Sequence, residues 1–210
     1  MKQRLLISIT GPSGTGKDAV INGLITQDKS LRRYTTATTR SPRPGEVNGV
    51  NYHFFTREDF HTRLQKGEFL EHNANYNGNL YGTLRADVEA IWQQNADAIS
   101  DINVDGVRAF RQSVPQQYFA ILMLPPSRDR LEARLTKRNP ELAEEGRKRL
   151  AQVEADLPHL HDPFYVFTNP DMHGSRLTDY DALFVNDDLE VTIYAVAARI
   201  AEERLRRGLK

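Results

Sequence analysis

Short apolar runs alternate with amphipathic segments along the chain. The runs Leu5–Thr10 and Phe119–Leu124 are almost wholly apolar, which is typical of strands buried on both faces of a sheet. In Lys17–Gln27 the apolar side chains recur at helical spacing, and Leu189–Leu205 repeats that pattern near the end of the chain. This alternation predicts an α/β fold in which helices cover both faces of a parallel sheet.

The remaining segments extend the same pattern. Further strands are expected at Tyr34–Thr38, Asn51–Phe55, Glu68–Tyr76 (strand or loop), Ala96–Val104, Phe164–Thr168 and Ala182–Asn186. Further helices are expected at Glu58–Leu64, Leu84–Gln94, Arg128–Arg138 and Glu141–Asp156. Turn signals such as Pro44-Gly45 are concentrated between residues 34 and 83. That region therefore indicates a small excursion of short strands from the main domain.

The turn after the first strand has the composition of a phosphate-binding loop. The pattern G-x-x-x-x-G-K-[ST] is met by Gly11, Gly16 and Lys17 and is missed at Asp18, its last position. Glycines let successive backbone N–H groups point at phosphate oxygens, and the following helix presents its positive end to the same anion. A plain glycine-rich turn would not require the lysine or the helix. The loop therefore predicts a nucleotide or another phosphorylated ligand.

The overall composition excludes several other classes of function. Lysine plus arginine equals aspartate plus glutamate, so bulk charge gives no reason to expect nucleic-acid or membrane binding. The chain has no cysteine, which excludes disulfides and cysteine-based metal or redox sites. The apolar start is too short for a signal peptide or a membrane span. We expect a soluble, cytoplasmic protein with one domain.

A second group of residues suits an anion. Arg40 and Arg43 lie among prolines and a glycine, and Tyr52 follows them. Arginine forks and a tyrosine hydroxyl are suitable donors for a phosphate, although the segment on its own could equally be a solvated basic turn.

Taken together, the motifs resemble those of guanylate kinases. The matching runs are GPSGTGK, TTRSPRPGEVNGVNYHF, GEFLEH, NLYGT, DINVDG, LPPSRDRLEARL and VNDDLE. They follow the family's order at nearly the family's spacing and cover most of the chain. The resemblance implies a phosphate-loop kinase core (residues 1–33, 84–136 and 151–210), a GMP-binding subdomain (about 34–83) and a helical lid (about 137–150). It also implies phosphoryl transfer from ATP to GMP with Mg²⁺.

The resemblance assigns roles to single residues. It implies that GMP contacts Thr36, Arg40, Arg43, Tyr52, Glu71, Tyr81, Thr83 and Asn103. It implies that ATP contacts Gly11, Pro12, Ser13, Gly14, Thr15, Gly16, Lys17, Asp18, Arg134 and Asn186. Lys17, Arg138 and Arg149 would serve the transferring phosphoryl group. Asp18 and Asp101 would hold Mg²⁺, in part through water. The carboxylate of Glu71 suits guanine, whose edge presents two adjacent N–H donors, and disfavours adenine.

Four features depart from the family pattern, one of which is about one extra residue between Glu71 and Tyr81. Asp18 replaces a serine or threonine, but its carboxylate is a hard oxygen donor that suits Mg²⁺. Asn103 stands where the family has a second guanine-reading aspartate, and its amide oxygen still accepts hydrogen bonds at the loss of one charge. The stretch 157–179 is longer than expected. Its His159, His161 and His173 fit no metal-ligand spacing, so we interpret it as a solvated loop.

Two alternatives remain open at this point. The loop with Asp18 also resembles that of kinases acting on ribose 1,5-bisphosphate, so the acceptor could be that compound, dGMP or another phosphorylated molecule. A guanylate-kinase-like module without turnover is the other alternative, and the intact Lys17, glycines and lid arginines argue against it. ATP and GMP are the expected partners, and we infer no protein, nucleic-acid or membrane partner.

Overall fold

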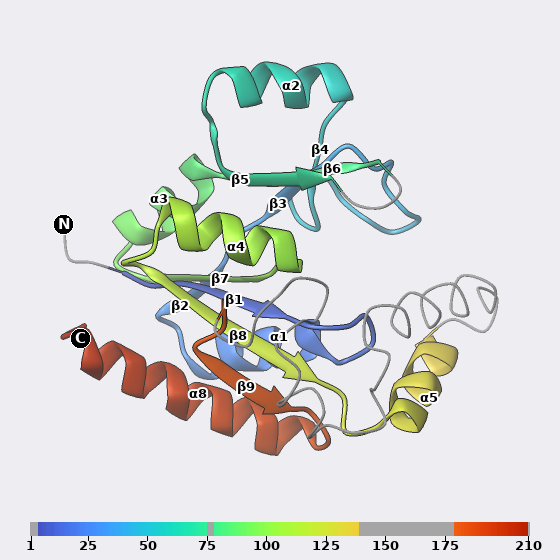
Figure 1. Cartoon of the computed structure of the whole chain (residues 1–210), viewed down its shortest axis with the longest axis vertical. Coiled ribbons are helices and arrows are strands. Elements are labelled where there is room, and N and C mark those ends of the chain that lie inside the picture. The colour runs from blue at the N-terminus through green and yellow to red at the C-terminus, as the bar shows by residue number, and fades with distance from the viewer. Residues whose placement is uncertain (1–3, 75–77, 139–178, 210) are drawn as a thin grey trace. The chain divides into compact units, whose positions relative to one another are not determined.

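The computed structural model describes residues 4–74, 78–138 and 179–209 (Figure 1). Contacts divide the chain into two compact units. The first is built mainly from Ile25–Phe119, and the second from Ile9–Leu24 and Ala120–Gly208. Strands β1 (Leu6–Thr10) and β8 (Tyr118–Leu124) contribute residues to both units and are buried along their whole length. Within the described ranges, no helix is both long enough and apolar enough to cross a membrane.

Five strands form the larger sheet, in the order β2-β7-β1-β8-β9. In the first unit, β2 (Leu31–Arg33) pairs in parallel with β7 (Asp97–Asp101). In the second unit, β8 pairs in parallel with β9 (Ala182–Val185). Helices α3 (Arg85–Gln93) and α4 (Val104–Ser113) flank β7 in sequence. The predicted α/β architecture with parallel strands is thus confirmed.

The first unit also contains a four-stranded sheet with the order β4-β3-β6-β5. Its strands are β3 (Thr36–Thr38), β4 (His53–Phe54), β5 (Phe69–Ala74) and β6 (Leu80–Leu84). Helix α2 (Arg57–Gln65) lies across this sheet (Figure 1). Its Phe60 is fully buried and stacks on Phe69 with ring centroids 4.4 Å apart, so the small sheet has a hydrophobic core of its own.

Helices α1, α5 and α8 belong mainly to the second unit. Helix α1 spans Lys17–Gln27, α5 spans Arg128–Arg138 and α8 spans Leu189–Arg206. A side-chain carbon on Gly23 of α1 would lie 2.3 Å from Ile193 of α8, so this glycine permits close packing of the two helices. Asp188 caps α8 by accepting a 3.0 Å hydrogen bond from the backbone N–H of Val191.

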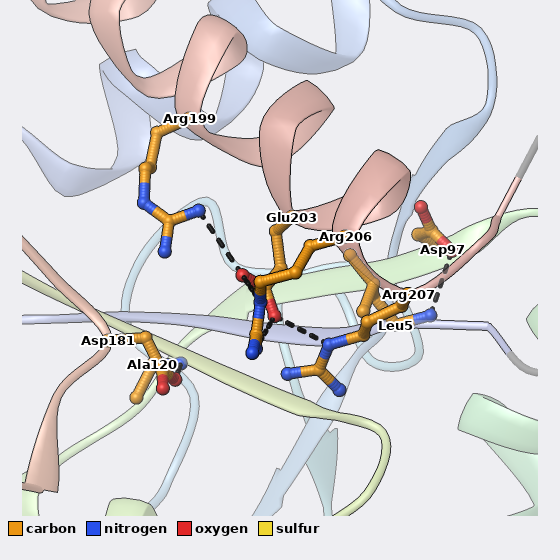
Figure 2. A network of polar contacts seen from close by, with 8 residues as sticks. All are labelled: Leu5, Asp97, Ala120, Asp181, Arg199, Glu203, Arg206 and Arg207. Carbon is orange, nitrogen blue, oxygen red and sulfur yellow. Dashed lines mark hydrogen bonds and ion pairs between the residues drawn. The ribbon is translucent and has the colours of Figure 1, made fainter.

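The end of α8 carries a buried ionic cluster, which Figure 2 shows at close range. The side chain of Glu203 is fully buried and accepts hydrogen bonds from Arg199, Arg206 and Arg207 at distances between 2.5 and 3.2 Å. Burial alone would raise the pKa of Glu203, but the arginines outweigh it and hold that pKa at about 2. Glu203 is therefore ionised at neutral pH.

Among the described residues, three elements are not predicted by the sequence pattern. Strand β2 is only three residues long and has one buried side chain, so no alternating pattern develops. Strand β6 contains Gly82, which resembles a turn signal; a side-chain carbon there would lie 2.8 Å from the ring of Phe69, so packing requires the glycine. Helix α4 begins where the predicted strand Ala96–Val104 still continued, because Asn103 caps it. The predicted segments Glu141–Asp156 and Phe164–Thr168 lie outside the described residues.

Candidate functional site

The phosphate loop joins β1 to α1, as predicted, and lies in the second unit. Neighbouring atoms lie so close to two positions of the loop that only glycine fits there. A side-chain carbon on Gly11 would lie 2.0 Å from the carbonyl oxygen of Met123, and one on Gly16 would lie 2.6 Å from Nδ2 of Asn186. Gly16 also has a φ of 89°, which other residues rarely adopt. The backbone shape of the loop therefore depends on both positions.

Polar contacts inside the loop place Lys17. Its Nζ donates hydrogen bonds to the carbonyl oxygens of Gly11 and Pro12 at 2.7 and 3.0 Å. The hydroxyl of Thr15 donates to the same Pro12 oxygen at 2.9 Å. The loop carbonyls thus hold the ammonium group against the loop at the N-terminus of α1. A cation and a helix N-terminus at one place suit an anionic ligand.

Asn186 and Arg134 carry buried polar atoms near this loop. Asn186 is 3% exposed, and its Nδ2 donates a 2.7 Å hydrogen bond to the carbonyl oxygen of Thr15. Nη2 of Arg134 donates to the carbonyl oxygen of Asp187 at 3.2 Å. Oδ1 of Asn186 and Nη1 of Arg134 are buried and have no hydrogen-bond partner among the described residues. A buried acceptor or donor without a hydrogen-bond partner costs about 1–3 kcal/mol of free energy. A polar ligand that pairs with these two atoms would remove that cost.

The two candidate Mg²⁺ ligands lie in different units. Asp18 is exposed in the first turn of α1. Asp101 ends β7 in the first unit, and its Oδ1 accepts a 2.9 Å hydrogen bond from Arg33. Within the described part of the chain, no three acidic, histidine or cysteine side chains gather as a metal cluster. Each carboxylate by itself is a donor that suits Mg²⁺, which is commonly bound by one or two carboxylates together with substrate phosphates and water.

Thr36, Thr83 and Glu71 form a row across three strands of the small sheet. Thr36 of β3 faces Thr83 of β6, and Thr83 faces Glu71 of β5. The hydroxyl of Thr83 donates a 2.8 Å hydrogen bond to Oε1 of Glu71. Thr83 is fully buried and Glu71 is 4% exposed. The register of the sheet thus brings together three of the predicted base-reading residues, which lie far apart in the sequence.

Glu71 is a buried carboxyl group whose hydrogen-bond donors are neutral. Burial raises its pKa from 4.5 to about 7, and hydrogen bonds from Thr83 and Asn73 partly oppose that rise. A buried carboxyl group with a shifted pKa is a frequent mark of a functional site. Its ionised form accepts two adjacent N–H donors, and its neutral form does so poorly.

Asn73 also belongs to this group, although no sequence motif predicts it. Its Nδ2 donates to Oε2 of Glu71 at 3.2 Å and to Oδ1 of Asn103 at 3.1 Å. Nδ2 of Asn103 returns a 2.7 Å hydrogen bond to Oδ1 of Asn73. The sequence does contain a signal for this residue, because positions 71 and 73 of one strand point to the same face of a sheet.

The candidate phosphate-binding residues of the first unit surround Arg40. Its guanidinium makes a two-point ion pair with Glu46, with both distances 2.9 Å. It also lies 5.3 Å from the ring centroid of Tyr52, and the Tyr52 and Tyr81 rings meet edge to face at 6.3 Å. Hydrogen bonding to Glu46, with a smaller contribution from Tyr81, raises the pKa of Arg40. Arg40, Tyr52 and Tyr81 are thus close together.

Arg43 lies at the edge of this cluster. Its backbone N–H donates a 2.7 Å hydrogen bond to Glu46, and its side chain is exposed. The hydrogen bond from Arg40 lowers the pKa of Glu46, and the charge of Arg43 adds to that effect. Arg138 is the last residue of α5, and nothing further is described for its side chain. Arg149 and the histidines of the 157–179 stretch lie outside the described residues.

Comparison with known proteins identifies the family. The guanylate kinase family model matches residues 2–203. The chain belongs to the guanylate kinase family. Guanylate kinase from Paramagnetospirillum magneticum is 36% identical over 206 residues, which is 98% of this chain and 88% of the relative. Guanylate kinase from Sus scrofa is 35% identical over 198 residues, or 94% of this chain and 92% of the relative. The resemblance seen in the motifs is confirmed.

A solved structure of the same family supports the fold. The crystal structure of guanylate kinase from Anaplasma phagocytophilum aligns with a TM-score of 0.69. It covers 97% of this chain and 87% of its own, at 23% sequence identity. The similarity confirms the predicted α/β fold of a phosphate-loop kinase.

Proposed function

We propose that the protein catalyses phosphoryl transfer from ATP to GMP, which yields ADP and GDP. Membership of the guanylate kinase family supports this activity. The observation that carries the choice of acceptor is the row of Thr36, Thr83 and the buried Glu71. Such a row matches the edge of guanine, where N1–H and the 2-amino group are donors and O6 is an acceptor.

The first unit supplies the proposed GMP-binding residues. Ionised Glu71 accepts from N1–H and the 2-amino group, and the hydroxyl of Thr36 donates to O6. The hydroxyl of Thr83 donates to Glu71 and so holds the carboxylate that reads the base. Arg40 and Arg43, with the hydroxyls of Tyr52 and Tyr81, bind the phosphate of GMP. The ion pair between Arg40 and Glu46 supports this role, since it presents the guanidinium in one orientation. Asn103 belongs to the same group through its two hydrogen bonds with Asn73, which contacts Glu71.

The second unit supplies the proposed ATP-binding residues. The backbone N–H groups of residues 11–18 surround the outer phosphates, and Lys17 exchanges its loop carbonyl partners for phosphate oxygens. Arg134 and Asn186 receive the adenine end, where their unpaired buried atoms gain hydrogen bonds. This acceptor and donor support the assignment because an adenine base offers both kinds of partner on one edge.

The proposed chemistry is direct in-line transfer, in which a phosphate oxygen of GMP attacks the terminal phosphorus of ATP. That oxygen is already ionised, so no general base is required. The protein contributes position and positive charge. Lys17 supplies part of that charge, and we propose that Arg138 and Arg149 of the lid supply the remainder. Asp18 would hold Mg²⁺, with Asp101 acting through water; when bound, the ion neutralises charge on the phosphates.

The test is a coupled assay of ADP release with Mg²⁺-ATP and a panel of acceptors: GMP, dGMP, AMP, UMP, CMP and ribose 1,5-bisphosphate. The expected result is turnover with GMP, weak or no turnover with AMP, and loss of turnover in Lys17→Ala with GMP binding retained. Turnover with ribose 1,5-bisphosphate alone would refute the proposal. Tight GMP binding without turnover on any acceptor would identify a binding module instead.

A further inference from the structure

A continuous chain of hydrogen bonds ends at the carboxylate of Glu71. It starts at the N-terminus of α4, where the backbone N–H of Gly106 donates to Oδ1 of Asn103 at 2.9 Å. Asn103 and Asn73 then exchange two hydrogen bonds, and Asn73 donates to Oε2 of Glu71. On the other side of the carboxylate, Thr83 donates to Oε1. Both oxygens of Glu71 are thus held by separate donors.

The backbone sets the direction of this chain. A helix N-cap must accept from a backbone N–H, so the end of Asn103 that faces Gly106 is its oxygen. The amide nitrogen of Asn103 then faces Asn73 and requires an oxygen there. This arrangement leaves the Asn73 nitrogen to face Glu71. A flip of either amide would put two donors or two acceptors opposite each other.

The orientation of a glutamate carboxylate is otherwise weakly determined. Rotation about the last side-chain bond is broad, because no staggered minimum restricts it. A contact to two neighbouring N–H groups of a base requires both oxygens to lie in the plane of that base. Thr83 restrains one oxygen and Asn73 restrains the other. Asn103 has both lone pairs of Oδ1 engaged by Asn73 and Gly106, so it acts on the base through Asn73.

We propose that Asn73 is a positioning residue that, together with Asn103, orients the Glu71 carboxylate to accept both N1–H and the 2-amino group of a guanine nucleotide. The proposal rests on the proposed GMP kinase activity and adds a specificity determinant to it. The amide pair selects for the 2-amino group without touching it. Loss of this amide pair should therefore weaken binding of a base that offers two adjacent N–H donors more than binding of a base that offers one.

The experiment compares GMP with inosine monophosphate, whose base keeps N1–H and O6 but lacks the 2-amino group. In Asn73→Ala the KM for GMP should rise about tenfold and that for inosine monophosphate about twofold, with kcat little changed. The preference for GMP then falls about fivefold. Asn22→Ala makes the same chemical change on the exposed face of α1 and should change neither KM.

The pH dependence gives an independent readout. Asn73→Ala removes a donor to the ionised carboxylate, so the midpoint of the pH dependence of the GMP KM should move upward by about half a pH unit. Titration of the GMP phosphate is common to both proteins and cancels in the comparison. Asn103→Ser retains an N-cap hydroxyl but loses the amide N–H, so it should reproduce the effect more weakly. The double variant should be no worse than Asn73→Ala alone.

These outcomes separate the two proposals. Absence of GMP turnover in the unaltered protein would refute the proposed function. If the unaltered protein phosphorylates GMP, an unchanged GMP preference and pH midpoint in Asn73→Ala would overturn the role of Asn73. An equal rise in KM for both nucleotides would also overturn it, since that result indicates a structural role alone. Should Asn73→Ala fail to fold, Asn103→Ser decides the question by the same criteria.

Discussion

Asn186 donates a 2.7 Å hydrogen bond from Nδ2 to the carbonyl oxygen of Thr15, and through it the residue after β9 holds the middle of the phosphate loop. The same nitrogen lies where a side chain at position 16 would have to go. Because Oδ1 of Asn186 is buried and has no partner among the described residues, one side chain both shapes the loop and presents an acceptor.

Asn186→Ala should therefore weaken ATP binding more than GMP binding. It removes the hydrogen bond to Thr15 and the proposed acceptor for the adenine end, so the KM for ATP should rise about tenfold or more. The KM for GMP should change less than twofold. Steady-state kinetics with each substrate varied in turn measures both values, and Asn22→Ala serves as the matched control. Equal increases in the two KM values would contradict a role at the ATP end.

Glu71→Gln should stabilise the ligand-free protein at high pH only. Because folding raises the pKa of Glu71 from 4.5 to about 7, the folded state keeps a proton that the unfolded chain has already released between these values. Its contribution to stability therefore falls as pH rises through that window and is lowest above pH 7. Glutamine is neutral throughout, so the variant should match the parent at pH 4.5 and exceed it by about 3 kcal/mol at pH 8.5.

Urea unfolding at these two pH values measures the difference. The same variant should bind GMP poorly, because an amide cannot accept from two adjacent donors. A variant that is more stable but binds GMP less well is the result expected when a buried carboxylate serves binding at the expense of stability. A stability difference that is the same at both pH values would show that Glu71 is not the titrating group.

Glu46→Ala tests the orientation of Arg40. The two-point ion pair presents the guanidinium to one side, so its removal should raise the KM for GMP about three- to tenfold and leave the KM for ATP unchanged. The exposed Glu58 of α2 offers a matched control in Glu58→Ala. A lower KM for GMP in Glu46→Ala would show that Glu46 competes with the substrate phosphate and would contradict the proposed orientation.

The sequence predicts the phosphate loop directly, but it does not by itself predict the contact between Glu71 and Thr83. The phosphate loop is local: its glycines, Lys17 and the helix that follows are consecutive, so their pattern alone predicts the structure. Glu71 and Thr83 are neighbours only because β5 and β6 pair in one register, with an irregularity between Phe69 and Glu71. No spacing rule gives that register, and the family motifs supplied it instead. The environment that raises the pKa of Glu71 is a property of the folded sheet.

Asn103 has two roles, and the sequence motifs indicate only one of them. The resemblance gives Asn103 a base-reading role, which does not indicate that it also caps α4. The sequence signal for the helix is the spacing of Val107 and Phe110 after Asn103. Its partner Asn73 has no counterpart in the motifs used and becomes visible only through its hydrogen bonds. Side chains that act through others are the hardest to find from sequence, because their position depends on two elements at once.

Glu203→Gln should destabilise the protein at neutral pH. Glu203 has its pKa held at about 2 by Arg199, Arg206 and Arg207, so its ionised form favours folding at every pH above its ordinary value of 4.5. That contribution is lost as pH falls from 4.5 through about 2. The buried amide of the variant leaves the arginines without a counter-charge, and we expect a loss of about 2 kcal/mol at pH 7.

Urea unfolding at pH 7 and pH 4 should show a smaller loss of stability in Glu203→Gln at the lower pH. Glu202→Gln changes the exposed neighbouring residue and should have little effect at either pH. An equal loss in both variants would refute the role of the cluster, because Glu202 differs from Glu203 in lacking burial.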